Sequence, residues 1–239
     1  MAKKFLIVLF AVFTVICVPI NTKAAGMNTG FKTTELSQED KKEFLSNIGF
    51  SFISKEPQKS KIECFDVSNN GLVAVGFSRL DNIYISVYNE SGSFCYGYVI
   101  EAHQSFGVEW DGDRLIIYFV RSDVAALLDL KGNILDIKRI EDTAENNFYW
   151  NNHVFSSQKN IGEYQYTLDK NMGILNLFMP TYARLIKTDS NGQKTIVYDA
   201  GKTQSVKSII IFTLTVLFVA FAIFKVARLF NAKDRKRLD

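Results

Sequence analysis

The chain has 239 residues, of which 47% are hydrophobic and 22% are charged, and its formal net charge is +3. Two basic residues near the start and six after residue 224 create this excess, because the rest of the chain holds 20 of the 28 basic and 23 of the 25 acidic residues. The remainder is slightly acidic with both signs interspersed, which excludes a basic face for binding nucleic acid.

The first 24 residues are typical of a signal peptide. Lys3 and Lys4 give a short basic start, residues 5–18 form an apolar core, and the small residue Ala24 suits a cleavage site. An uncleaved signal anchor is the alternative, and it gives the same orientation because the basic start stays in the cytoplasm. Either way, we expect the middle of the chain to be exported.

Residues 25–61 are predicted to form a lead-in with one short helix. Ser37 is a suitable helix cap, and Asp40 lies three positions later, before apolar residues on helical spacing that begin at Phe44. Gly49 suits the end of this helix, because glycine readily adopts the left-handed conformation that closes a helix.

Residues 62–199 are predicted to form an extracytoplasmic β domain. Apolar residues alternate with their neighbours, as in 83–87 and 115–119, and this is the spacing of strands. Short segments rich in Gly and Asn separate these runs, and both residue types accept the positive φ of hairpin turns. The pattern predicts a mainly β fold built as an antiparallel meander.

A weak internal repeat lies within this β domain. Residues 87–94 align with 127–134, forty residues later, and again with 185–193, where a turn glycine keeps its place. A period near forty with four short strands resembles the blades of a β-propeller of the NHL or WD-like kind. The resemblance implies three or four blades in a partial propeller, or sheets packed as a sandwich. A generic meander whose hairpins all need glycine is the alternative.

Cys64 and Cys95 are the cysteines of the β domain. An oxidising compartment permits a disulfide between them. The alternative is two thiols, because the residues fall on the first and last strands of one predicted meander, which are not neighbours in a sheet. There is no CxxC motif, Cys/His cluster or phosphate-binding loop, so we predict no metal and no cofactor.

The sequence does not indicate a catalytic site. His103, Ser105 and Asp111 can be assembled into a triad on paper, but no nucleophile motif supports it. Glu109, Asp111 and Asp113 form a carboxylate cluster of the kind that binds hard cations. Asp-Gly-Asp is also a hairpin turn, however, and no further ligands follow at the spacing of a calcium loop.

One stretch, residues 145–153 (ENNFYWNNH), has the composition of a binding surface. Asn147, Tyr149, Trp150 and Asn151 are the candidate binding residues. Aromatic rings stack on a sugar or peptide, and side-chain amides make paired hydrogen bonds. The alternative is a strand whose aromatic face packs into the core.

The C-terminal region divides into a linker, a transmembrane helix and a basic cytoplasmic tail, at residues 200–206, 207–226 and 227–239. Ser208 to Phe224 contains no charge, Gly or Pro, and as a helix it spans roughly 25 Å. Lys207 and Lys225 can reach the two interfaces of the bilayer, and Arg228 begins the basic tail that stays in the cytoplasm.

This arrangement resembles membrane proteins of Gram-positive bacteria, which implies no activity. We expect a single-pass plasma-membrane protein whose exported β domain is a binding, sensing or protein-interaction module. Its expected partners are membrane lipid, through the helix and tail, and a protein or cell-wall component. The alternatives are an exported hydrolase acting near the membrane and an accessory subunit of a membrane complex.

Overall fold

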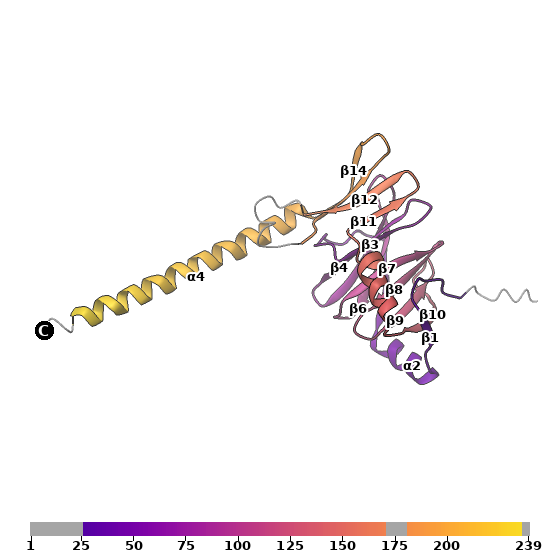
Figure 1. Cartoon of the computed structure of the whole chain (residues 1–239), viewed down its shortest axis with the longest axis horizontal. Helices are drawn as coiled ribbons and strands as arrows, with labels where there is room; N and C mark the ends of the chain where they lie inside the picture. Colours follow the sequence, from indigo (N-terminus) through magenta and orange to yellow (C-terminus); the bar gives the residue numbers. More distant parts are fainter. Residues whose placement is uncertain (1–25, 171–180, 236–239) are drawn as a thin grey trace, which may run out of the picture.

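The structure is a computed structural model that describes residues 26–170 and 181–235; in the last helix it describes the side chains of residues 201, 206 and 209–225. The predicted signal peptide, residues 1–24, lies outside the described residues. Across the described residues, the fold is mainly β, with antiparallel sheets throughout, as the sequence predicted (Figure 1).

Three consecutive meanders, each of four antiparallel strands, make up the domain. The first comprises β3 (Cys64–Val67), β4 (Val73–Arg79), β5 (Asn82–Tyr88) and β6 (Phe94–Glu101). The second comprises β7 (Phe106–Asp111), β8 (Arg114–Phe119), β9 (Val124–Leu128) and β10 (Ile134–Ile140). The third comprises β11 (Gln158–Ile161), β12 (Tyr164–Asp169), β13 (Arg184–Thr188) and β14 (Lys194–Asp199).

The lead-in adds one strand to each of the first two meanders. Strand β1 (Thr33–Glu35) pairs with β10, and β2 (Gly49–Ile53) pairs with β6. Helix α2 (Gln38–Asn47) connects them, and its cap is as predicted, because Ser37 Oγ accepts a hydrogen bond from Asp40 N at 3.0 Å. The predicted role of Gly49 was wrong, since this residue begins β2 instead of closing the helix.

The three meanders share the same final hairpin. Gly92, Gly132 and Gly192 lie between the third and fourth strands of their meanders, with φ angles of 80°, 84° and 79°. Each glycine N–H donates to the carbonyl three residues earlier, at 3.0 Å in all three turns. The three glycines therefore occupy equivalent turns, as the predicted repeat requires, and glycine is needed here because other residues rarely adopt this φ.

The residue that opens each of these turns fixes the turn with its side chain. In all three cases its Oδ1 atom accepts backbone hydrogen bonds from the residues two and four positions later, at 2.8–3.1 Å. The three opening residues are Asn89, Asp129 and Asp189. Asn and Asp suit this position because their short side chains can bond to nearby backbone N–H groups.

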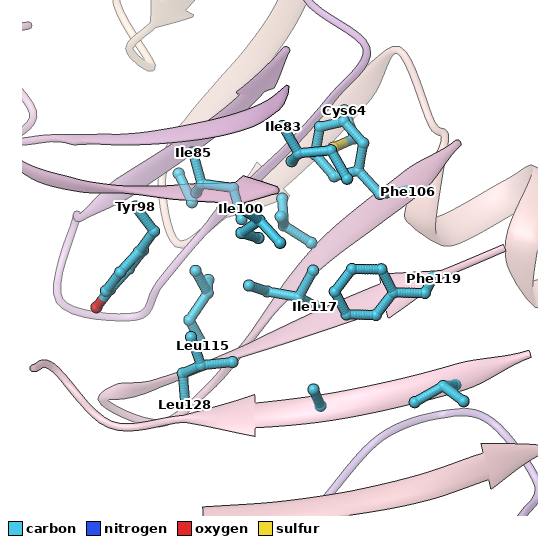
Figure 2. Packing of buried hydrophobic residues seen from close by; sticks show 14 of the residues in the cluster. Cys64, Ile83, Ile85, Tyr98, Ile100, Phe106, Leu115, Ile117, Phe119 and Leu128 are labelled. Atoms are coloured by element: carbon cyan, nitrogen blue, oxygen red, sulfur yellow. The ribbon is translucent and has the colours of Figure 1, made fainter. Parts of the chain in front are cut away.

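The first meander lies between the other two. One apolar cluster joins it to the second meander, and Figure 2 shows Ile83 and Ile85 on one side of this core with Leu115 and Ile117 on the other. A second cluster joins its opposite face to the third meander, through residues such as Phe65. A third covers the outer face of the second meander. The sheets thus pack face to face, which agrees with both the partial-propeller and the sandwich expectation.

Helix α4 (Gly201–Arg235) follows β14 after a single residue and projects away from the sheets (Figure 1). Residues 201–206 of the predicted linker are thus part of α4. Ala200 is buried and its N–H donates to Ala183 O at 2.8 Å, while Gly201 N donates to Asp199 Oδ1 at 2.7 Å. Within the stretches of chain that the structure describes, we find no helix with a segment long and apolar enough to cross a membrane.

We predict that Gly92→Ala destabilises the domain more than Gly192→Ala. Both changes place Cβ at positive φ, which costs roughly 1–2 kcal/mol. At Gly92 the added Cβ also meets the Ile196 carbonyl oxygen at 2.9 Å, whereas at Gly192 it meets nothing within 4 Å. Urea denaturation followed by the fluorescence of the chain's two tryptophans measures both variants. Equal losses of stability in the two variants would contradict the close contact between β14 and the final hairpin of the first meander.

Candidate binding pocket where the three meanders meet

A buried carboxylate joins the first strands of the three meanders. Asp66, on β3, accepts a hydrogen bond from Trp110 N on β7 at 2.7 Å. Its other oxygen accepts from Lys159 Nζ on β11 at 2.8 Å. The Asp66 and Lys159 side chains are only 9% and 7% exposed, so the ion pair is shielded from water.

The alternation of side chains along strand β11 explains why Lys159 reaches this position. Its neighbours in the strand are exposed, while Lys159 points inward and is buried. The Lys159 ammonium also lies 5.6 Å from the centre of the Phe65 ring, within the range of a cation–π contact. A buried lysine needs such partners, because an unpaired charge away from water is costly.

The candidate binding stretch forms a helix that covers the second meander, so the strand alternative was wrong. Helix α3 (Ala144–Tyr149) is continued by the π-helix η1 (Trp150–Val154). Thr143 Oγ1 caps α3 by accepting from Asn146 N at 3.2 Å. Buried Asn146 exchanges hydrogen bonds of 2.9 Å with both backbone groups of Lys32. The helix is thereby fixed to a segment 114 residues away in the sequence.

Glu109, on β7, binds this helix to the sheet beneath. Its carboxylate accepts hydrogen bonds from Tyr149 Oη at 2.6 Å and from the Tyr118 hydroxyl, and it lies 3.6 Å from His153 Nε2. Burial opposes the negative charge, but His153, Tyr118 and Tyr149 outweigh it and hold the pKa of Glu109 below its usual value. Burial, reinforced by the Glu109 charge, raises the pKa of both tyrosines, so they remain donors.

An open pocket of about 440 Å³ lies beside these two groups. Its walls come from β3, β7, η1 and β11, so all three meanders contribute to it. The lining includes Asp66, Lys159, Glu109 and His153. The other polar lining side chains are mainly amides, namely Asn69, Asn152, Gln158 and Asn160. The arrangement can offer paired donors and acceptors to a ligand, and its charged groups already have partners in the protein.

None of the four predicted binding residues lines this pocket, although they directly precede the lining residues Asn152 and His153 in the chain. Tyr149 and Trp150 point inward, and the Trp150 ring packs 4.6 Å from that of Phe31. Asn147 and Asn151 are exposed on the helix, where Asn151 Nδ2 donates to Asn147 O at 2.8 Å. Residues further along the chain supply this side of the lining, namely Asn152, His153 and Ser156. The helical register therefore directs Asn152 and His153, rather than the four predicted residues, to this pocket.

His103, Ser105 and Asp111, the residues of the hypothetical catalytic triad, are not brought together. Ser105 precedes β7 and Asp111 ends it, so the length of the strand separates them. His103 Nδ1 lies 3.3 Å from Asp81 Oδ1. Asp111 Oδ2 accepts from Arg114 at 2.5 Å instead.

The carboxylates of 109, 111 and 113 are also directed to different partners. Glu109 faces the tyrosines, Asp111 pairs with Arg114, and Asp113 accepts from Asn70 at 2.8 Å. Among the described residues, no three His, Cys, Asp or Glu side chains are grouped as metal ligands.

Cys64 and Cys95 are free thiols in this structure. They lie on β3 and β6 of one sheet, with β4 and β5 between them. Strands are spaced about 4.8 Å apart, so three spacings exceed the reach of a disulfide. Cys64 is buried, which raises the pKa of its thiol, whereas Cys95 is exposed.

No protein-family model matches the chain, and a search of curated proteins found no significant match.

We predict that Asp66→Ala destabilises the domain by about 3–5 kcal/mol, because it leaves the Lys159 ammonium buried without a counter-charge. The double variant Asp66→Ala/Lys159→Met recovers some of this loss by removing the stranded charge. Asp113→Ala, which removes an exposed carboxylate, is the control and changes stability by less than about 0.5 kcal/mol. Urea denaturation measures all three variants, and a single-variant loss no larger than that of the control contradicts the bridging role.

We predict that Glu109→Gln destabilises the protein by about 1–3 kcal/mol at pH 7, because hydrogen bonds to a charged acceptor are the stronger ones. The pKa of Glu109 is lowered on folding, so its contribution is present above the ordinary value of 4.5 and disappears as the pH falls through the lower folded value. The difference between wild type and variant should therefore shrink below pH 4.5. The exposed control Glu163→Gln should show no such convergence in denaturation curves collected across this pH range.

Proposed function

We propose that the protein is a single-pass, membrane-anchored extracytoplasmic binding module whose ligand occupies the pocket between the meanders. The location of that pocket carries the proposal, because every meander contributes a first strand to it. The meanders would be successive blades of an open propeller, in which the first strands lie innermost. The equivalent hairpins and the sequential strand order support this assignment.

The exposed surface of α4 supports the membrane anchor. The large apolar side chains between Ile209 and Phe224 are 49–72% exposed. They occupy nearly consecutive positions, so they surround the helix on all sides, as expected of a helix immersed in lipid. Lys225 marks the end of this apolar segment, with its Nζ 5.8 Å from the Phe221 ring centre.

The charge arrangement at the pocket favours binding over hydrolysis. A general base works best when its pKa lies near the working pH and its lone pairs are available. Glu109 has a lowered pKa and already accepts from two tyrosines. Asp66 is neutralised by Lys159. Both carboxylates therefore suit the task of holding the pocket walls in place better than that of activating water.

We predict that a residue before α4 and a residue near its C-terminal end differ in accessibility to a reagent outside intact cells. In a background with Cys17→Ser and Cys95→Ser, Asn191→Cys should react with a membrane-impermeant maleimide without lysis. Asn231→Cys should react only after permeabilisation. Asn191 is exposed in the last hairpin, so its labelling reports on which side of the membrane it lies and not on burial within the protein.

Two outcomes overturn the proposed topology. One is the reverse labelling pattern, and the other is release of the full chain from membranes by alkaline carbonate. Wild-type Cys95, which is exposed on β6, serves as an independent native probe of the same compartment.

A further inference from the structure

We infer that the pocket takes an uncharged carbohydrate rich in hydroxyl and acetamido groups. This inference rests on the proposed function and specifies its ligand class. It follows from three features: charged lining groups that already have partners, clustered amides in the lining, and an exposed ring between two lining residues in the chain.

The charged groups of the lining already have partners within the protein. Asp66 and Lys159 pair with each other at 2.8 Å. Glu109 accepts from two hydroxyls and lies 3.6 Å from His153. An anionic or cationic ligand would have to displace these partners or lose its hydration without a counter-charge, which is costly. A neutral ligand avoids this cost.

The amides keep hydrogen-bonding capacity for such a ligand. Asn152 Nδ2 donates to Phe148 O at 2.9 Å, which leaves its carbonyl oxygen available. Asn160 Oδ1 accepts from Gln165 at 3.4 Å, which leaves its two N–H groups. Gln158 is exposed on the same strand, two residues before Asn160. An amide presents a donor beside an acceptor, and neighbouring sugar hydroxyls match this pair.

An exposed aromatic side chain, that of Phe155, lies between two lining residues in the chain. Phe155 is 38% exposed and stacks on Trp150, with ring centres 5.5 Å apart and planes inclined by 16°. Nearby residues on both sides of it in the chain, His153 and Ser156, line the pocket. A ring held in this way can cover the apolar face of a sugar at low entropic cost. The pocket volume of about 440 Å³ falls within the range of small-ligand sites.

The test uses the full-length protein in lipid nanodiscs, without sugar-based detergents, and chitotetraose as the probe. Titration calorimetry should give saturable binding. Gln158→Leu and Asn160→Leu should each weaken it at least tenfold, because leucine keeps the volume but removes the hydrogen bonds. Phe155→Ala should weaken it as well. Asn191→Leu removes an exposed amide remote from the pocket and should leave the affinity unchanged.

Several outcomes overturn the inference. They are the absence of saturable binding to chitotetraose, equal weakening by the Asn191 control, and preferential binding of a charged oligopeptide over the sugar. Circular dichroism of each variant separates lost binding from lost folding; if Asn160→Leu fails to fold, the milder Asn160→Ser replaces it with the same expectation. Because this assay needs no intact cell, a failure here is distinguishable from a failure of the proposed topology.

Discussion

The Asp66 carboxylate is the interaction on which the arrangement of the domain depends. Among the described residues, each sheet ends at the first strand of its own meander, and the backbone pairing between meanders is one isolated bridge, between Ile62 and Tyr182. Asp66 spans those strands by accepting from Trp110 N and Lys159 Nζ. A buried ion pair gives little net stability compared with apolar packing, but its geometry is demanding. It therefore contributes a directional contact to all three sheets at once, whereas the hydrogen bonds between Ser60 and Tyr198 and the Lys187–Glu90 ion pair each join only the first and third meanders.

Glu109 has a comparable role at the outer side of the second meander. It links the sheet of this meander to the helical segment that connects it to the third. Both carboxylates line the same pocket, and both are engaged with partners from the surrounding elements. Amides make up most of the other polar lining side chains.

Local signals in the sequence were sufficient for much of the fold. Gly92, Gly132 and Gly192 were recognisable because a hairpin with positive φ depends on a few adjacent residues, and the same holds for the Ser37 cap. The segment after Thr143 was misjudged because its helix is fixed by Asn146 to Lys32, far away in the sequence. The pairing of Asp66 with Lys159 spans 93 residues and has no local pattern. For the same reason, the sequence did not indicate that Asp66, Glu109 and Lys159 would line one pocket.

The direct passage from β14 into α4 has a mechanical consequence. Only buried Ala200 separates strand from helix, and hydrogen bonds to Ala183 and Asp199 fix the junction. We therefore expect a rotation or tilt of α4 about this point to move β14 and, through the antiparallel strand pairing, β11, whose Lys159 lies in the pocket wall. A short, hydrogen-bonded junction of this kind couples the helix to the third meander more directly than a flexible linker would.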